Sequence, residues 1–230
     1  MKRNNKTALI TGATGGIGLS IARELAKKGY RLALAYRSNK RAAERLAGAC
    51  ARLGAPKVFI VHCDIRNERS IRRAARKTVR HFGRISVLIN NAGVNVMKPL
   101  RMQSFREIDM QLETNLGGLI KFTKVLLPFI GGAIINIASR AGKIAKPSMT
   151  VYCATKFGVR GFTQSLAQEE LALRVLSVNP DRVATRMVGF RGRPPRDVAR
   201  VVADLLDGKR TAASGTDIDL WKVLRDTKSR

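Results

Sequence analysis

Three side chains near the middle of the sequence have the types and the spacing needed for proton transfer. Tyr152 and Lys156 are four residues apart in a segment predicted to be helical, so they share one face and lie one turn from each other. Ser139 ends the apolar run before that helix and can direct its hydroxyl toward the same point. A free tyrosine titrates near ~10, and a neighbouring ammonium favours the phenolate. The three residues therefore predict a phenol that exchanges a proton with a substrate.

Short apolar runs alternate with amphipathic segments along the chain and predict the elements that position these residues. Continuous apolar runs are typical of parallel strands buried on both faces. The alternation predicts a single-domain, Rossmann-like α/β fold over residues 1–230, a doubly wound three-layer αβα sandwich with a parallel sheet of about seven strands. Expected strands are 7–10, 31–36, 58–61, 87–89, 133–138, 174–178 and 216–220; expected helices run from the first glycine loop to 28 and over about 42–53, 68–82, 108–129, 150–171 and 195–207.

The carboxyl ends of the expected strands carry glycine and polar residues. Ligands of such folds bind at that edge of the sheet, where Gly12, Asp64, Asn91, Ser139 and Pro180 all fall. The loop after the first strand is rich in glycine and precedes a helix, so its backbone can approach a pyrophosphate at the helix N-terminus. The sequence therefore predicts a dinucleotide site beside the proton-transfer group.

Five motifs in order resemble those of the short-chain dehydrogenase/reductase family, most closely its 3-oxoacyl-[acyl-carrier-protein] reductase type. The glycines at 12, 16 and 18 are similar to the TGxxxGxG loop, and residues 90–93 read NNAG. Asn115 falls where the family has a helix asparagine, Ser139 precedes the tyrosine by 13 residues, and residues 152–156 match YxxxK. The resemblance covers the whole chain.

This resemblance implies a role for each matching residue. Tyr152 would donate a proton to the substrate carbonyl oxygen, Lys156 would lower the pKa of that tyrosine and hold the nicotinamide ribose, and Ser139 would bond the same carbonyl. Asn115 would anchor a water relay behind the lysine. The cofactor-binding residues implied by the family are Gly12, Thr14, Gly15, Gly16, Ile17 and Gly18 at the pyrophosphate, Asp64 and Ile65 at the adenine, Asn91, Ala92 and Gly93 under the ribose, Tyr152 and Lys156, and Pro180, Val183 and Thr185 near the carboxamide.

The end of the second strand predicts a preference for NADPH over NADH, with NAD use possible. An acidic residue there would bind the ribose 2′-hydroxyl, whereas an arginine accommodates a 2′-phosphate. The chain has Arg37 and Ser38 and no carboxylate at these positions. Gly15 is a departure, because many NADP-using relatives carry a basic residue inside the loop.

Two further departures concern the substrate side of the site. Asp181 follows Pro180 where the family usually has glycine, and the segment 186–195 is short where the family commonly has a longer substrate lid. A short lid suggests an open pocket or a substrate borne on a carrier. Basic residues near the site would suit an acidic carrier or a phosphopantetheine arm: Arg140, Lys143, Lys146 and Arg186. Sugar, steroid and small-ketone reductases share the same motifs and remain alternatives.

The charge of the chain favours a second hypothesis, a dinucleotide-sensing or nucleic-acid-binding protein. Lys and Arg number 44 against 16 Asp and Glu, a formal net charge of +28. Arginines cover one face of the expected helix 68–82 without interleaved aromatic residues, so we expect only weak, non-specific nucleic-acid binding. A general excess of basic residues on solvated helix faces is the explanation of the charge that we favour.

The remaining features predict a cytoplasmic homo-oligomer. Cys50, Cys63 and Cys153 lack metal-ligand spacing and suit free thiols in a reducing compartment, so no metal is expected. No segment reads as a signal peptide or a membrane span. The family implies a homodimer or homotetramer through the helices 108–129 and 150–171, which are rich in apolar residues: Leu116, Leu119, Phe122, Val125, Leu126, Phe157 and Phe162.

Overall fold

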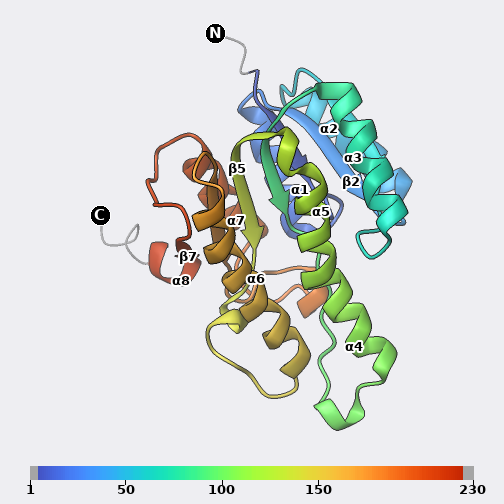
Figure 1. Ribbon diagram of the computed structural model, residues 1–230, viewed down its shortest axis with the longest axis vertical. Helices are drawn as coiled ribbons and strands as arrows, with labels where there is room; N and C mark the ends of the chain where they lie inside the picture. Colours follow the sequence, from blue (N-terminus) through green and yellow to red (C-terminus); the bar gives the residue numbers. More distant parts are fainter. Residues whose placement is uncertain (1–4, 225–230) are drawn as a thin grey trace.

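Seven parallel strands form one sheet in the computed structural model, which describes residues 5–224 (Figure 1). The ends of the expected 1–230 domain, including the basic start Met1-Lys2-Arg3, lie outside these residues. The strands are β1 (Thr7–Ile10), β2 (Arg31–Tyr36), β3 (Val58–His62), β4 (Ile85–Asn90), β5 (Ile130–Ile137), β6 (Arg174–Asn179) and β7 (Asp217–Asp219). Their order is β3-β2-β1-β4-β5-β6-β7, and all six pairings are parallel.

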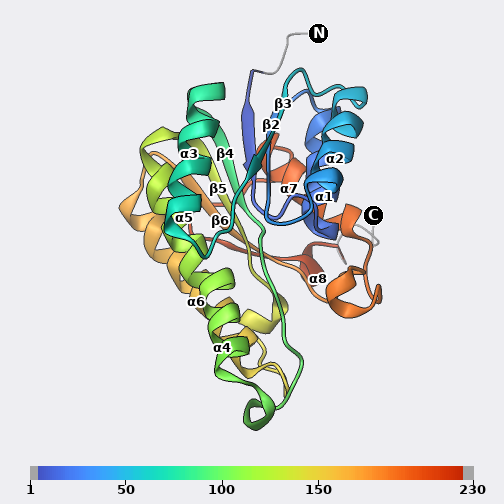
Figure 2. The ribbon, with the colours of Figure 1, turned by 90° about the vertical axis from the view of Figure 1, so that its right-hand side faces the viewer.

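Helices cover both faces of the sheet and complete the predicted three layers. Figure 2 shows α1 (Gly16–Lys27), α2 (Lys40–Arg52) and α7 (Pro195–Leu206) on one side. The other side carries α3 (Glu68–Phe82), α5 (Gly118–Leu126) and α6 (Thr150–Glu169). The short α8 (Leu220–Val223) follows β7. The structure confirms the predicted doubly wound αβα sandwich.

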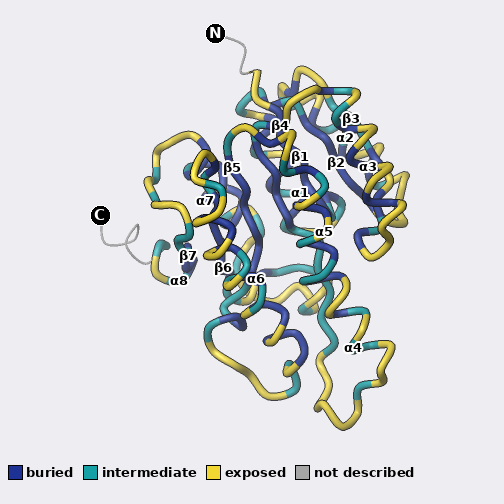
Figure 3. The backbone as a smooth tube through the Cα atoms, viewed as in Figure 1, coloured by how far each residue is buried: buried dark blue, intermediate teal, exposed yellow. Residues whose placement is uncertain are grey.

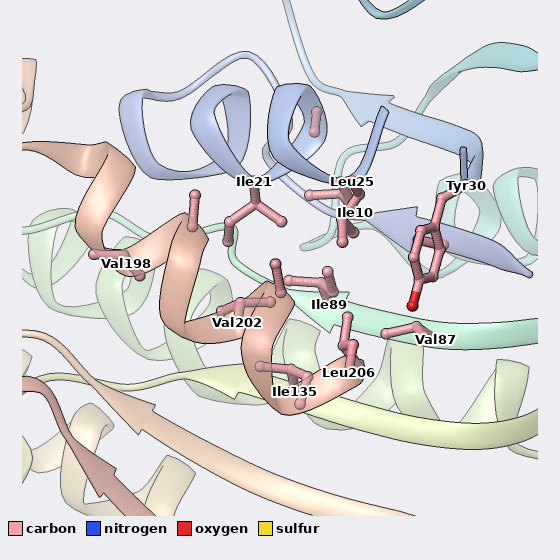
Figure 4. Packing of buried hydrophobic residues seen from close by; sticks show 14 of the residues in the cluster. Ile10, Ile21, Leu25, Tyr30, Val87, Ile89, Ile135, Val198, Val202 and Leu206 are labelled. Atoms are coloured by element: carbon pink, nitrogen blue, oxygen red, sulfur yellow. The ribbon is translucent and has the colours of Figure 1, made fainter. Parts of the chain in front are cut away.

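Apolar side chains between the layers hold the sheet in place. In Figure 4, Ile21 and Leu25 of α1 and Val198 and Val202 of α7 point toward Ile10, Ile89 and Ile135 of the strands. All seven of these side chains have 0% exposure. Burying one such side chain fully stabilises the fold by about 1.5–3 kcal/mol. Figure 3 shows the strands buried along most of their length, as their continuous apolar runs predicted.

The expected regular helix over 108–129 is wrong in detail. The chain forms α4 (Phe105–Leu112), a π-helical turn (Glu113–Gly117), α5 and a 3₁₀ turn (Leu127–Phe129). The segment begins earlier than expected because Ser104 and Glu107 form a capping box. Gly118 is needed where the segment crosses the loop after β3, since a Cβ there would collide with the Ile65 carbonyl. The α4 end projects away from the sheet (Figure 1).

Other element ends differ from the expectations by one to three residues. Strand β5 begins at Ile130, three residues early, and β7 covers only Asp217–Asp219. Helix α6 ends at Glu169 instead of at 171. Within residues 5–224, no helix is long and apolar enough to span a bilayer. In the same range, no group of three His, Cys, Asp or Glu side chains is placed to hold a metal ion.

Candidate active site

The structure brings Ser139, Tyr152 and Lys156 together at the carboxyl end of β5. Ser139 follows the strand and begins a short 3₁₀ turn (Arg140–Gly142), whose first amide, that of Ala141, donates to its Oγ at 3.1 Å. Tyr152 and Lys156 lie on the first turns of α6 and are 8% and 4% exposed. The hydroxyl groups of Ser139 and Tyr152 are hydrogen-bonded. The predicted triad is therefore one contiguous group, in which Tyr152 and Lys156 are buried and Ser139 is partly exposed.

Burial controls the protonation of this group more than the lysine does. Desolvation raises the pKa of Tyr152 to about 12, and the hydrogen bond with Ser139 only partly opposes it. Desolvation also lowers the pKa of Lys156 to about 8. The Lys156 ammonium lies 5.7 Å from the centre of the Tyr152 ring and donates to the Ile137 carbonyl at 2.8 Å. The expected lowering of the tyrosine pKa is thus wrong for the protein alone.

Asn115 connects the neighbouring elements. Its Oδ1 accepts from the Val94 amide at 2.8 Å, and its Nδ2 donates to the Val94 carbonyl at 2.9 Å and to Thr155 Oγ1 at 3.2 Å. These bonds join the loop after β4 to α6 between Tyr152 and Lys156. Asn115 sits in the π-helical turn, which widens the helix there. Such turns occur often at functional sites.

A cavity of about 380 Å³ lies in front of this group, along the carboxyl ends of the strands. Its wall includes Tyr152 and Lys156 at one end and Arg37 and Ser38 at the other. Most of the predicted cofactor residues also line it: Gly12, Thr14, Gly15, Gly16, Ile17, Asp64, Ile65, Asn91, Ala92, Gly93 and Thr185. Segments from five strand ends thus contribute to one elongated hollow.

Glycine allows the backbone to pack closely around this hollow. Gly12 has φ +60°, and a Cβ there would lie 2.9 Å from the Ala92 Cα. A Cβ on Gly18 would lie 2.5 Å from the Gly12 carbonyl, and one on Gly16 would lie 2.8 Å from Thr185 Cγ2. Gly18 therefore packs against the back of the glycine loop and does not line the cavity. This tight turn between β1 and the N-terminus of α1 fits a dinucleotide pyrophosphate, and its place in the fold is that of the dinucleotide site in doubly wound α/β proteins.

An ion pair holds Asp64 in place at the end of the cavity that is predicted to bind the adenine. Asp64 pairs with Arg66, whose Nη2 lies 3.1 Å from the carboxylate. The hydrogen bond from Arg66 lowers the pKa of Asp64, and the charge of Arg37 adds to this effect. Arg37 and Ser38 are both exposed at the rim. An anionic group at this end would therefore meet Arg37 first.

Besides Gly18, four predicted site residues are not part of the cavity wall. Ser139 and Asn115 stand behind Tyr152 and Lys156, as described above. The Pro180 carbonyl accepts from the Arg140 amide at 2.7 Å, and Val183 forms an isolated bridge with Arg193. Asp181 also contacts Arg193, at 3.3 Å, so this departure from the family holds the end of the short segment 186–195 against the loop after β6.

Several lining residues were not predicted from the sequence. They are Thr11, Ala35, Cys63, Val94, Thr114, Ile137, Ala138, Arg186 and Met187. Most are small or apolar residues beside a recognised motif, so their position next to a motif was the only available signal. Thr114 lies far from the other lining residues in sequence, and only the π-helical turn brings it to the cavity. Burial raises the pKa of the Cys63 thiol to about 12, which makes it a poor nucleophile.

A second hollow lies between α3 and α5, away from the first. Its volume is about 480 Å³, and its lining residues are Arg72, Ala75, Arg76, Val79, Arg80, Val125 and Phe129. The predicted arginine face of α3 is exposed, whereas the apolar face is buried or partly buried. The expectation that no aromatic residue joins these arginines is wrong, because Phe129 is 40% exposed beside them. The sequence conceals this contact, since Phe129 is 49 residues beyond Arg80.

Comparisons with known proteins agree with the fold and show the family. Residues 6–194 match the model of the short chain dehydrogenases. The 3-oxoacyl-[acyl-carrier-protein] reductase FabG of Staphylococcus epidermidis is 37% identical over 179 residues, which cover 76% of this chain and 72% of that protein. D-threitol dehydrogenase of Mycolicibacterium smegmatis is 38% identical over 191 residues, 80% of this chain and 72% of that protein.

Solved structures of dehydrogenases have the same architecture. A Serratia marcescens short-chain dehydrogenase/reductase mutant superposes with a TM-score of 0.88 at 25% identity, covering 95% of this chain and 97% of that one. An alcohol dehydrogenase of the archaeon Thermococcus sibiricus, complexed with 5-hydroxy-NADP, has a TM-score of 0.84 at 30% identity, with 93% and 94% covered. The chain belongs to the short-chain dehydrogenase family. It is an NAD(P)-dependent oxidoreductase that acts on CH–OH groups.

Proposed function

We propose that this protein reduces a carbonyl group to an alcohol with NADPH, and that Tyr152 is the proton donor. The observation that carries this proposal is the contact of the Ser139 hydroxyl with the buried Tyr152 phenol, with Lys156 one turn away, at the end of a glycine-lined cavity. Because burial keeps the pKa of Tyr152 near 12, the phenol holds its proton at neutral pH. A protonated phenol is the form needed to donate to a developing alkoxide, which is the proton transfer that carbonyl reduction requires.

Each of the other site residues has a distinct task in this proposal. Ser139 bonds the carbonyl oxygen and orients the Tyr152 hydroxyl, and Lys156, charged below about pH 8, binds the ribose hydroxyls. Asn115 keeps the loop after β4 in register with α6 through its bonds to Val94 and Thr155, which is also where a water relay would be anchored. A positioned general acid of this kind contributes about 10²–10⁴-fold to the rate.

The glycine loop after β1 fits the cofactor. The backbone packs so closely there that side chains at Gly12, Gly16 or Gly18 would collide with the surrounding chain. When bound, the nicotinamide supplies the hydride. Residues 12–18 would hold the pyrophosphate, Asp64 and Ile65 the adenine, and Asn91, Ala92 and Gly93 the ribose. Pro180, Val183 and Thr185 would meet the carboxamide side.

Arg37 and Ser38 support a preference for NADPH over NADH. They line the adenine end of the cavity, and Arg37 can form a charge-assisted bond with a 2′-phosphate. Replacing Arg37 with Met keeps an unbranched side chain of similar stem and removes the guanidinium and its charge. The kcat/KM for NADPH should then fall toward that for NADH. Equal values for the two cofactors in the unmodified protein would refute the preference.

A 3-oxoacyl thioester on a carrier is the substrate that we favour. The relatives at 37% identity are 3-oxoacyl-[acyl-carrier-protein] reductases, and the exposed Lys146 and Arg186 could meet an acidic carrier. The support from basic residues is smaller than the sequence suggested. Lys143 is paired with Asp219 and Asp217, and the Arg140 guanidinium lies 5.2 Å from the centre of the Trp221 ring. Small ketones, sugars and steroids remain alternatives.

The test of the function is NADPH oxidation against a panel of carbonyl compounds. The panel includes a 3-oxoacyl thioester on coenzyme A and on a carrier protein, a keto sugar, a steroid ketone and a small ketone. Turnover of any of these compounds that is lost in Tyr152→Phe supports the proposed reaction. Faster turnover of the carrier thioester than of the coenzyme A thioester supports the substrate. No turnover of any member would refute the function.

We further propose that residues 1–230 act as one catalytic domain in the cytoplasm, with 186–195 as a short substrate lid. All seven strands of residues 5–224 lie in one sheet, and Met187 of the lid lines the cavity. The three cysteines are buried and unpaired, which suits a reducing compartment. The alternative function, a dinucleotide-sensing or nucleic-acid-binding protein, is favoured by the net charge of +28 and by the arginine-lined hollow between α3 and α5.

A further inference from the structure

Behind the Ser139 loop, two carboxylates at the last strand meet two basic side chains in a largely buried cluster. Asp217 and Asp219 lie on β7, Lys143 ends the 3₁₀ turn that follows Ser139, and Arg160 lies on α6 one turn after Lys156. Asn179, at the end of β6, completes the group. We call these five residues the β7 clamp. Their side chains lie outside the wall of the catalytic cavity.

Arg160 is the centre of the β7 clamp. Its Nε and Nη2 donate to Asp217 Oδ2 at 2.9 and 2.6 Å, and its Nη1 donates to the Gly142 carbonyl at 2.6 Å. One guanidinium therefore joins the last strand, helix α6 and the turn after Ser139. Arg160 can serve all three because its planar fork presents several donors at once.

The remaining contacts close the β7 clamp around the same turn. Lys143 Nζ lies 2.9 Å from Asp219 Oδ2 and 3.4 Å from Asp217 Oδ2. Asn179 Nδ2 donates to the second oxygens of Asp217 and Asp219 at 3.2 and 3.0 Å. Burial alone would raise the pKa of Asp217, but the bonds from Arg160 and Asn179 and the charges of Arg160 and Lys143 hold it below its usual value. The carboxylate is therefore ionised at neutral pH.

The turn held by the clamp is pressed against the catalytic residues. A Cβ on Gly142 would lie 2.6 Å from the Lys156 carbonyl, so the turn touches the backbone of the residue proposed to bind the ribose. Ser139, at the start of the turn, is bonded to Tyr152. Arg140, between them, faces Trp221 of α8. A shift of this turn would therefore move Ser139 relative to Tyr152.

We propose that Asp217 and Arg160 are positioning residues, which set the place of the Ser139 turn against α6 and thereby align the Ser139 and Tyr152 hydroxyls. The inference rests on the proposed function for its catalytic consequence, whereas the geometric part concerns the protein alone. The proposed role differs from that of a purely stabilising ion pair. Apolar residues of similar size can often replace a pair of that kind with little loss of stability. A leucine pair could fill the space, but it would leave the Gly142 carbonyl without its donor.

The decisive variant is Arg160→Leu/Asp217→Leu, which removes both charges together and leaves neither one unpaired. The matched control is Lys28→Leu/Asp207→Leu, an ion pair between the ends of α1 and α7, distant from the site. A second variant, Arg160→Lys, keeps the charge but loses the planar fork. We expect kcat to fall about 10- to 100-fold in the leucine pair, since small displacements of reacting groups cost this much. Arg160→Lys should have an intermediate kcat, and the control should match the unmodified protein.

Two measurements do not depend on turnover. Hydrogen exchange of the amides of residues 140–143 should speed up in the leucine pair and stay unchanged in the control. Trp221 is the only tryptophan in the chain, so a change in its fluorescence reports movement of Arg140. The dissociation constant for NADPH should change less than twofold. If the unmodified protein reduces no carbonyl compound, the proposed function fails, but these measurements still decide the positioning role.

Two results would overturn the inference. One is a leucine pair with unchanged exchange at residues 140–143 and unchanged Trp221 fluorescence. The other is a leucine pair that retains the kcat of the unmodified protein in spite of faster exchange. If the leucine pair does not fold, Arg160→Lys decides the question: wild-type kcat and wild-type exchange would contradict the proposal, and a drop in both would support it.

Discussion

Tyr152 and Lys156 show how one environment acts in opposite directions on an acid and a base. Both side chains are almost completely buried, and burial penalises whichever form is charged. The pKa of the phenol is therefore raised to about 12, and that of the ammonium is lowered to about 8. At neutral pH the tyrosine carries a proton that it can donate, and the lysine is still charged.

Removing the Tyr152 hydroxyl should abolish turnover and leave the cofactor site nearly intact. Tyr152→Phe deletes only the proton donor, because most of the cavity wall lies on other strand ends. We expect kcat to fall at least about 100-fold, the lower end of what general acid catalysis contributes. NADPH affinity, measured by fluorescence titration, should change little. Residual activity above a tenth of that of the unmodified protein would indicate another donor.

The lowered pKa of Lys156 predicts how cofactor binding depends on pH. Lysine is charged below its pKa, so the charge proposed to hold the ribose is present up to about pH 8 and is lost above it. NADPH affinity should therefore be constant below about pH 7 and should weaken between pH 7 and 10. In Lys156→Met the affinity should be weaker at pH 7 and flat over the whole range. An unmodified protein with constant affinity up to pH 10 would contradict this account.

At the scale of elements, the turn between β1 and α1 decides whether a dinucleotide fits. Gly18 packs against the Gly12 carbonyl and the Asn91 amide, which brings the start of α1 to the ends of β1 and β4. Gly15 precedes α1 with φ −78°, a conformation open to any residue, and a Cβ there would meet only the Gly12 carbonyl at 3.3 Å. The two glycines therefore differ in how much room a side chain would have, although both lie in the same loop motif.

Alanine substitutions should separate these two glycines. Gly18→Ala forces backbone apart and should destabilise the fold by about 1–3 kcal/mol, the usual cost of overpacking. It should also weaken NADPH binding, because the glycine loop must widen. Gly15→Ala serves as the control and should change the free energy of unfolding by less than about 1 kcal/mol. Denaturant unfolding and NADPH titration measure both effects. Equal losses in the two variants would contradict the distinction.

At the scale of the whole molecule, the helices on the α3–α5–α6 side carry exposed apolar residues, but fewer than the sequence suggested. Leu119, Phe122 and Leu126 are buried in the core of the chain itself, so they are not available to a partner. Leu116, Val125 and Phe162 are partly buried against it. Phe105, Leu112 and Phe157 remain exposed at 87%, 41% and 43%. The expectation of an oligomer therefore rests on these three exposed residues.

We expect a homodimer or homotetramer through α4 and α6, because burying exposed aromatic side chains against a second copy is favourable. Phe157→Asp should reduce the mass measured by light scattering at micromolar concentration. Leu171→Asp is the control, since Leu171 is 87% exposed beyond the other end of α6. A monomeric mass for the unmodified protein would refute the expectation.

The net charge of +28 predicts weak, sequence-indifferent binding of DNA and RNA that fades as salt rises. Removing three charges from the hollow between α3 and α5, with Arg72, Arg76 and Arg80 changed to Gln, should weaken binding more than the same change at Arg41, Arg45 and Arg52 of α2. Phe129→Ala should add a smaller loss if bases stack on the ring. Titrating labelled oligonucleotides at two salt concentrations tests this. Tight, sequence-selective binding at physiological salt would favour the nucleic-acid-binding alternative.

The sequence by itself determined the order of strands and helices and most residues of the candidate site. Apolar runs and glycine punctuation are local signals, so β1, β2 and α3 could be predicted within a residue or two of their ends. The motif spacing also placed Gly12, Asn91 and Tyr152 at one edge of the sheet, because parallel strands end there together.

Only the tertiary structure decided how these residues are held and charged. Thr114 reaches the cavity through a π-helical turn, and Arg160 meets Asp217 across 57 residues of sequence. The second contact has no local signal, since it depends on where separate elements pack, whereas Thr114 adjoins Asn115, a residue that the motif had already placed at the site. The pKa values of Tyr152 and Lys156 changed in directions set by burial, and burial is a property of the whole fold. The sequence therefore indicated which groups react, and the packing around them decided their protonation.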